Sequence, residues 1–302
     1  MPEVDSIIED DCLTALTTLP DQCIDLVFTS PPYADNRRST YKGVPIQQYV
    51  AWFLPISAQL KRVLKPDGSF VLNIKERAAN GERQTYVLEL ILAMKKEQNW
   101  LWTEEYIWHK KNCYPGKWPN RFRDAWERCL HFTKQKNFRM FQDAVRLPMG
   151  QWAERRLERL SRTDRTRDES HVGSGFGKNV SNWLGRQYAY PTNVIHLATE
   201  CSNRGHSASF PIALPSWFIR LFTAEGDLVL DPFIGSGTTA IACIQLQRHY
   251  IGIEAMTQYR ALALKSIEKA KARPQAPRLI AESLATTPYN VGESEHMPRR
   301  SR

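Results

Sequence analysis

The sequence predicts an α/β fold built on an open, largely parallel sheet. Short apolar runs typical of buried strands alternate with longer segments whose apolar residues recur every three or four positions, as in amphipathic helices. Strands that alternate with helices in this way form parallel sheets. The 302 residues suffice for one large domain with an insertion, and the 42% of hydrophobic residues suffice for a sizeable core.

The first third of the chain supplies three strand–helix pairs and a further strand. We expect strands at 6–8, 24–28, 69–74 and 100–108, and helices at 13–19, 48–64 and 85–98. The helix at 48–64 is predicted from the spacing of Trp52, Ile56, Leu60 and Val63. The turn chemistry of Lys65-Pro66-Asp67-Gly68 separates it from the next strand.

The last third of the chain continues the alternation. We expect strands at 193–197, 228–230 and 250–254, and helices at 214–222, 238–246 and 257–272. Residues 273–302 contain Pro, Ser and Glu without periodicity, which is typical of a tail.

A glycine-containing loop follows the strand at 228–230. The strand ends at Asp231-Pro232, because proline cannot continue a central strand. Gly235 and Gly237 allow positive φ angles before the helix at 238–246. A strand, a tight loop and a helix N-terminus together bind small ligands at the carboxyl edge of a parallel sheet.

The next strand ends in an acid, Glu254, 17 residues after Gly237. A carboxylate at that position can accept hydrogen bonds from both hydroxyls of a ribose. The pattern favours a nucleoside-type ligand. The alternative is a tight turn and a solvated glutamate.

The second polar strand end is Ser30-Pro31-Pro32-Tyr33, after the strand at 24–28. Two consecutive prolines fix φ twice and remove two N–H donors, while their carbonyl groups can still accept. With the flat ring of Tyr33, this rigid turn suits a planar ring held by its amino group. The alternative is a strand terminated by Pro-Pro, with Tyr33 packed on the sheet.

Together the two stretches resemble the amino-methyltransferases of DNA. Ser30-Pro31-Pro32-Tyr33 resembles their catalytic motif, and the segment 231–238 resembles their S-adenosylmethionine motif. The catalytic motif comes first, which resembles the circularly permuted group called β. Further similarities lie at 8–12, 63–71, 108–110, 127–133 and 206–211, so the resemblance covers roughly residues 5–270, apart from a middle segment.

The resemblance implies a Rossmann-like methyltransferase fold with a largely parallel seven-stranded sheet, circularly permuted, and an inserted target-recognition region. Residues 1–135 would form the catalytic half and 193–272 the S-adenosylmethionine-binding half. Residues 136–192 would form the target-recognition region, and 273–302 the tail.

The resemblance also implies the site residues. The catalytic residues would be Ser30, Pro31, Pro32 and Tyr33. The residues binding S-adenosylmethionine would be Asp11, Asp231, Pro232, Phe233, Gly235, Ser236, Gly237, Thr238 and Glu254. Asp231 would face the methionine end of the cofactor, Glu254 its ribose and Asp11 its adenine. No metal is expected.

The reaction implied is methylation of an exocyclic amino nitrogen of a base flipped out of duplex DNA. Ser at the first motif position favours cytosine N4, with adenine N6 as the alternative. A DNA-binding protein on a decayed methyltransferase core and an RNA or protein methyltransferase are further alternatives. By resemblance, the setting would be a restriction–modification system with a cognate endonuclease as partner; oligomeric state is left open.

The charge agrees with a nucleic-acid partner. The formal net charge is +9 and the sequence pI about 9.3, which favours an anionic partner. Residues 109–135 mix basic and aromatic side chains, a composition that suits a nucleic-acid surface. The residues proposed to contact double-stranded DNA are Arg37, Arg38, Lys42, Arg155, Arg156, Lys178 and Arg186.

The remaining composition predicts a cytoplasmic location. The six cysteines are scattered without a C-x-x-C pair, which indicates reduced thiols and no metal site. No run approaches the roughly 20 apolar residues of a membrane-spanning helix, and the amino-terminal segment lacks a signal-peptide pattern.

Overall fold

The computed structural model describes residues 3–34, 43–113, 116–149, 186–199 and 210–272. The chain divides into two compact units, Met1–Val145 with Tyr190–Arg278, and Arg146–Ala189 with Leu279–Arg302. Within the second unit, the described residues form a short antiparallel ribbon of β10 (Leu147–Pro148) and β11 (Tyr188–Ala189).

An eight-stranded sheet organises the first unit, in the order β1-β14-β13-β2-β3-β9-β6-β12. The strands are β1 (Ser6–Ile8), β2 (Ile24–Thr29), β3 (Leu64–Ile74), β6 (Leu101–Lys110), β9 (Trp126–Thr133), β12 (Val194–Leu197), β13 (Leu228–Asp231) and β14 (His249–Ile253). Only β9 runs against its neighbours in this sheet. The predicted α/β class and the largely parallel sheet are confirmed.

The implied count of seven strands is wrong by one. β12 extends the sheet at its edge, in parallel register from Val194 opposite Ile107 to Leu197 opposite Lys110. The indole N–H of Trp108 also donates to the carbonyl oxygen of Leu197 at 3.1 Å.

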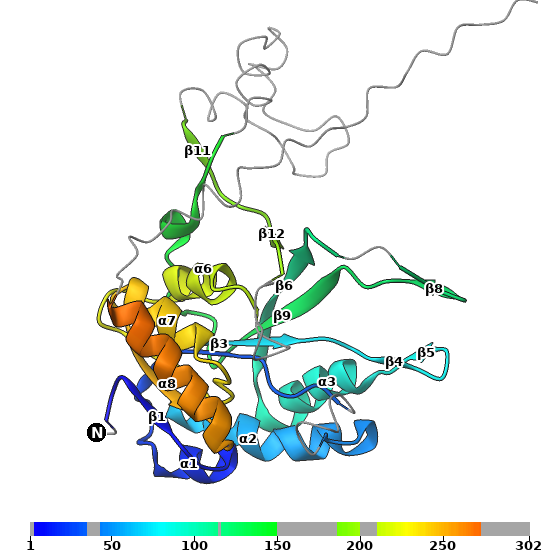
Figure 1. The fold of residues 1–302 in the computed structure, drawn as a ribbon, viewed down its shortest axis with the longest axis horizontal. Helices are drawn as coiled ribbons and strands as arrows, with labels where there is room; N and C mark the ends of the chain where they lie inside the picture. Colours follow the sequence, from blue (N-terminus) through cyan, green and yellow to red (C-terminus); the bar gives the residue numbers. More distant parts are fainter. Residues whose placement is uncertain (1–2, 35–42, 114–115, 150–185, 200–209, 273–302) are drawn as a thin grey trace, which may run out of the picture. The chain divides into compact units, whose positions relative to one another are not determined.

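Helices cover both faces of the sheet (Figure 1). One layer holds α1 (Cys12–Thr18), α2 (Tyr49–Val63) and α3 (Tyr86–Gln98); the other holds α6 (Ala213–Phe222), α7 (Thr238–Gln245) and α8 (Thr257–Ala272). The predicted stripe of α2 is confirmed at Ile56, Leu60 and Val63, which are buried, whereas Trp52 is half-buried. No helix among the described residues is long and apolar enough to cross a membrane.

The order of the strands explains how distant motifs meet. β2 pairs with β3 on one side and with β13, about 200 residues later, on the other. The last two strands of the chain therefore lie inside the sheet, and β1 closes its edge beside β14. This is the permuted order that the two motifs imply.

The predicted turn at 65–68 is instead a bulge within β3. The register with β2 changes from Ile24 opposite Leu64 to Leu26 opposite Ser69, so that Asp25 alone faces four residues. Asp25 is buried, and its carboxylate accepts from Lys65 Nζ at 2.7 Å and from the backbone N–H of Leu228 at 3.0 Å. The bulge therefore brings Lys65 to a buried charge that needs a partner.

Residues 136–145 pack with the first unit. Arg139 bonds Asp25 at 2.8 Å and Asp227 at 2.7 Å, and the backbone N–H of Phe141 donates to Leu221 at 2.6 Å. The second unit thus begins at Arg146, ten residues after the predicted start of the target-recognition region at 136. The recognition role of that region stays a prediction, and the expected tail lies outside the described residues.

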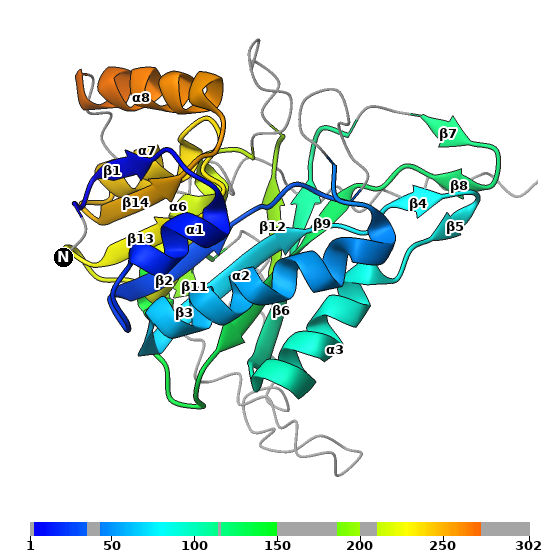
Figure 2. The same cartoon turned by 90° about the horizontal axis from the view of Figure 1, so that it is seen from below.

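Two small ribbons lie side by side beyond the sheet (Figure 2). They are β4 (Ala78–Ala79) with β5 (Glu82–Arg83), and β7 (Lys117–Trp118) with β8 (Arg121–Phe122). Arg83 of one ribbon bonds Asp124, which lies just beyond the other.

Candidate active site

The two motifs meet where β2 and β13 end side by side. The hydroxyl of Thr29, the last residue of β2, donates to Asp231 Oδ1 at 2.7 Å across 202 positions of sequence. Thr29 precedes the Ser30–Tyr33 turn, and Asp231 begins the glycine-containing loop. One buried hydrogen bond therefore joins the two predicted motifs at the carboxyl edge of the sheet.

Asp231 is held by the chain itself. Only 2% of the residue is exposed, and its carboxylate accepts from Thr29, from the backbone N–H of Phe233 at 3.1 Å and from the hydroxyl of Thr239 at 2.6 Å. Burial raises the pKa of Asp231 to about 6, although these hydrogen bonds lower it. The carboxylate thus fixes both ends of the loop, and its predicted contact with a ligand stays a prediction.

The glycine loop has the predicted backbone. Gly235 has a φ of 52° and Gly237 a φ of 87°, values that glycine adopts without strain. The loop also packs on β14, because the backbone N–H of Ile234 donates to Ile253 at 3.1 Å. Gly252 makes this approach possible, since an added Cβ would lie 2.4 Å from Ile234 Cδ1.

Glu254 lies directly after β14 and holds the loop from the other side. Its carboxylate accepts from the backbone N–H of Gly235 at 3.1 Å and from that of Met256 at 3.0 Å. Burial raises the pKa of Glu254, while these backbone hydrogen bonds lower it. The predicted acid therefore lies at the loop, and its bond to a ribose stays a prediction.

Asp11 lies at the same edge and caps α1. Its Oδ1 accepts from the backbone N–H of Leu13 at 2.9 Å and from that of Thr14 at 3.3 Å. Asp11 is exposed, and both of these capping bonds use Oδ1 rather than Oδ2. Burial is the main cause that raises the pKa of Cys12, and the charges of Asp11 and Asp231 raise it further. Both acids therefore lie near this thiol.

An aromatic pair borders the loop. The rings of Phe233 and Trp52 are 5.9 Å apart between centroids, and both residues are half-buried. Ser236 and Thr238 are also half-buried, whereas Pro232 is buried. The sequence predicts Trp52 only as part of the apolar stripe of α2 and gives no sign of its contact with Phe233.

The Ser30–Tyr33 turn is anchored from α2. The hydroxyl of Tyr49, which is fully buried, donates to the carbonyl oxygen of Pro32 at 3.0 Å. Of the two proline carbonyl groups predicted to be acceptors, that of Pro32 is therefore already used by the chain. Pro31 is buried, and Ser30 is half-buried.

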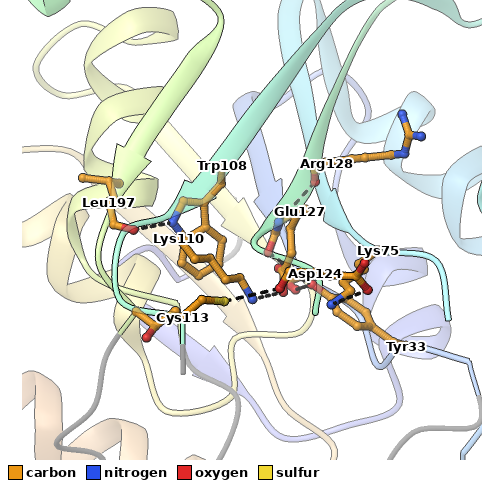
Figure 3. A network of polar contacts seen from close by, with 12 residues as sticks. Tyr33, Lys75, Trp108, Lys110, Cys113, Asp124, Glu127, Arg128 and Leu197 are labelled. Atoms are coloured by element: carbon orange, nitrogen blue, oxygen red, sulfur yellow. Dashed lines mark hydrogen bonds and ion pairs between the residues drawn. The ribbon is translucent and has the colours of Figure 1, made fainter. Parts of the chain in front are cut away.

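Tyr33 points into a polar network (Figure 3). Its hydroxyl donates to Glu127 Oε2 at 2.8 Å, and it lies 3.4 Å from Asn73 Oδ1 and 3.3 Å from Ser30 Oγ. Burial, and then the charge of Glu127, raise the pKa of Tyr33 well above its ordinary value. Lys110 Nζ approaches Glu127 Oε1 at 2.5 Å and lies 4.8 Å from the centroid of the Trp108 ring.

Known proteins are similar along most of the chain. The N6/N4 DNA methylase family model matches residues 24–265. The type II methyltransferase M.PvuII of Proteus hauseri is 30% identical over an alignment of 274 residues, and the match covers 83% of this chain and 80% of that protein.

The chain belongs to the N6/N4 DNA methylase family.

Solved structures agree on the fold of this DNA methylase. The PvuII DNA methyltransferase (cytosine-N4-specific) is 25% identical, with a TM-score of 0.66 over 89% of this chain and 92% of that one. A Thermus thermophilus protein described as a DNA modification methylase, complexed with S-adenosyl-L-methionine, is 23% identical. Its TM-score is 0.57 over 90% of this chain and 96% of that one.

Most residues predicted to contact DNA are not placed in the methylase structure. Arg37, Arg38, Lys42, Arg155, Arg156 and Lys178 lie outside the described residues, and Arg186 is exposed. Sequence reasoning missed Glu127, Asn73 and Gly252. Only Gly252, a glycine inside a strand, carries a local signal, that of a close backbone approach.

Proposed function

We propose that this DNA methylase transfers a methyl group from S-adenosylmethionine to the N4 amino group of a flipped cytosine in duplex DNA. The Thr29–Asp231 bond carries the proposal, because it sets the Ser30–Tyr33 turn against the glycine loop. Ser30, and the similarity to a structure described as cytosine-N4-specific, favour cytosine. The similarity to a type II methyltransferase supports a role in restriction–modification.

The residues at the loop fit S-adenosylmethionine. Asp11 offers Oδ2 as an acceptor, and Phe233 and Trp52 provide partly exposed aromatic surface for an adenine. Gly235, which is half-buried and lacks a side chain, allows a ligand to approach the backbone of the loop closely. When bound there, S-adenosylmethionine supplies an electrophilic methyl group.

The chain's own residues would orient the amino nitrogen. A base inside the stack cannot reach this edge, so it must be flipped out. The hydroxyl of Ser30 and the carbonyl oxygen of Pro31 would accept hydrogen bonds from the amino group, while Tyr33, fixed through Glu127, would provide the stacking surface. Acceleration would come from positioning and from acceptors that stabilise the positive charge developing on nitrogen.

The test is mass spectrometry of nucleosides from host DNA after expression of the wild type and of Ser30→Ala. We expect N4-methylcytosine with the wild type and its loss with the variant. Calorimetric binding of S-adenosylmethionine by both proteins is the control, since Ser30 lies in the turn and not in the glycine loop. Loss of cofactor binding in Ser30→Ala would make the turn structural.

Adenine N6 is the second candidate, because the family model covers both reactions. N6-methyladenine in place of N4-methylcytosine would overturn the cytosine assignment and leave methyl transfer intact. Detection of neither methylated base would overturn the assignment of DNA as the substrate.

A further inference from the structure

A cleft of about 260 Å³ opens beside the catalytic turn, and cationic side chains dominate its lining. Lys75 follows β3, Lys110 ends β6, and Arg121 and Arg123 lie before β9. Asp124 is the one carboxylate among the lining residues. Even when Glu127, the partner of Lys110, is counted, four cations face two carboxylates, which favours an anionic occupant.

Asp124 holds two of the four cations, Lys75 and Arg121, in position. It lies 3.3 Å from Lys75 Nζ and 3.8 Å from Arg121 Nη1, and it also bonds Arg83. Burial would raise the pKa of Asp124, but Arg83 and Lys75 together lower it below its usual value. The carboxylate is therefore ionised at neutral pH and orients Lys75 and Arg121. The charge of the cleft lining stays positive, because the cations exceed the carboxylates.

Two uncharged lining residues of the cleft, Asn112 and Thr199, are fixed to each other by hydrogen bonds. Asn112 Oδ1 accepts from the backbone N–H of Thr199 at 2.6 Å and from its hydroxyl at 2.9 Å. Asn112 Nδ2 donates to the carbonyl oxygen of Thr199 at 3.2 Å. These bonds tie the chain after β6 to the chain after β12, so the recess is formed before any ligand arrives.

Lys110 connects the cleft with the catalytic turn (Figure 3). Its ammonium lies 2.5 Å from Glu127 Oε1, and Glu127 Oε2 accepts from the hydroxyl of Tyr33 at 2.8 Å. One carboxylate thus separates the cleft from the tyrosine that would stack on the flipped base. In a nucleotide, one sugar separates the base from its phosphate, so a phosphate site close to the stacking residue suits the same nucleotide.

We propose that this cleft binds a phosphate of the DNA strand that carries the flipped nucleotide, directly flanking that nucleotide. The proposal rests on the proposed methylation of a flipped base. Arginine side chains suit phosphate oxygens because the guanidinium can donate two parallel hydrogen bonds. Such a contact carries no sequence information but fixes the position of the nucleotide.

The test uses a duplex that contains the methylated sequence found by sequencing host DNA. One flanking phosphate, 5′ or 3′ to the target, is replaced by an uncharged methylphosphonate. With the wild type, one of these replacements should lower kcat/KM. Arg123→Gln and Lys75→Gln should lower kcat/KM on the unmodified duplex and be insensitive to the same replacement.

A matched charge change serves as the control. Lys95→Gln removes a charge in the last turn of α3, which leads to the amino end of β6. The cleft lies at the other end of that strand, where Lys110 lines it. Each cleft variant should reduce the salt slope of duplex binding by about 1, as for one lost phosphate contact, and Lys95→Gln should not. All variants should bind S-adenosylmethionine like the wild type.

The outcomes separate the two proposals. Cleft variants that keep the full methylphosphonate effect, or the full salt slope, would overturn the phosphate site alone. A wild type that methylates no DNA would overturn the proposed function and the phosphate site with it.

Discussion

Tyr33 combines a ring and a hydroxyl whose roles can be separated. The hydroxyl bonds Glu127 at 2.8 Å, and Glu127 is tied to Lys110, so this bond fixes the orientation of the ring. Glu127 is only 7% exposed, and a buried carboxylate that loses a donor is costly. The ring itself would provide the stacking surface for the base.

We therefore expect Tyr33→Phe to keep activity at a reduced level and Tyr33→Ala to lose it. Loss of one hydrogen bond worth about 1 kcal/mol corresponds to roughly a fivefold fall in the rate of the methylation step. Single-turnover methylation of the target duplex measures this rate directly. Equal inactivity of Tyr33→Phe and Tyr33→Ala would show that the hydroxyl takes part in the chemistry.

At the scale of elements, the glycine loop and β14 form one packed unit. Gly252 leaves room for Ile234, whose Cδ1 would lie 2.4 Å from an added Cβ, and Ile234 N–H bonds β14 through Ile253. A side chain at this strand position would therefore force the Ile234 side chain, and the loop that carries it, to shift.

Gly252→Ala should displace the loop. Overpacking costs typically about 1–3 kcal/mol, and binding of S-adenosylmethionine should weaken along with the free energy of unfolding. Both are measurable, by calorimetry and by urea unfolding.

Ile234→Val provides the matched variant for Gly252→Ala, because it removes the methyl group nearest to the new Cβ. Alone it should cost about 0.5–1.5 kcal/mol. In the double variant the cost should be less than the sum of the two. Additive costs would show that the two residues do not compete for the same space.

At the scale of the whole molecule, the sequence predicts the elements well but not the contacts between distant ones. Periodicity places α2 and α3, the segment 231–238 identifies Asp231 and the two glycines of the loop, and the end of the next strand identifies Glu254. Glu127 reaches Tyr33 across 94 positions of sequence, and no local pattern marks it. The bulge at 65–68 depends on the buried charge of Asp25, which a turn-like composition does not reveal.

Two buried titratable groups contribute opposite slopes to the dependence of stability on pH. Burial raises the pKa of Asp231 to about 6 from 3.8, so the folded protein holds this proton more tightly, and stability falls as pH rises from 4 to 6. Burial lowers the pKa of His131 to about 3 from 6.5, so the unfolded chain takes up this proton first, and stability rises over the same interval. The two slopes have opposite signs, and each reaches at most about 1.4 kcal/mol per pH unit.

We expect these slopes to cancel largely in the wild type between pH 4 and 6 and to appear when one group is removed. Relative to the wild type, the free energy of unfolding of Asp231→Asn should rise with pH, because the falling contribution of Asp231 is lost. Relative to the wild type, the free energy of unfolding of His131→Phe should fall as pH rises. The pH profile of the double variant should again be parallel to that of the wild type. Urea unfolding at pH 4.5, 5.2 and 6.0 measures these differences in the free energy of unfolding. Packing lost in a variant shifts its whole profile by a constant amount and leaves the slope unchanged. Parallel profiles for all four proteins would show that neither group titrates abnormally in the folded state.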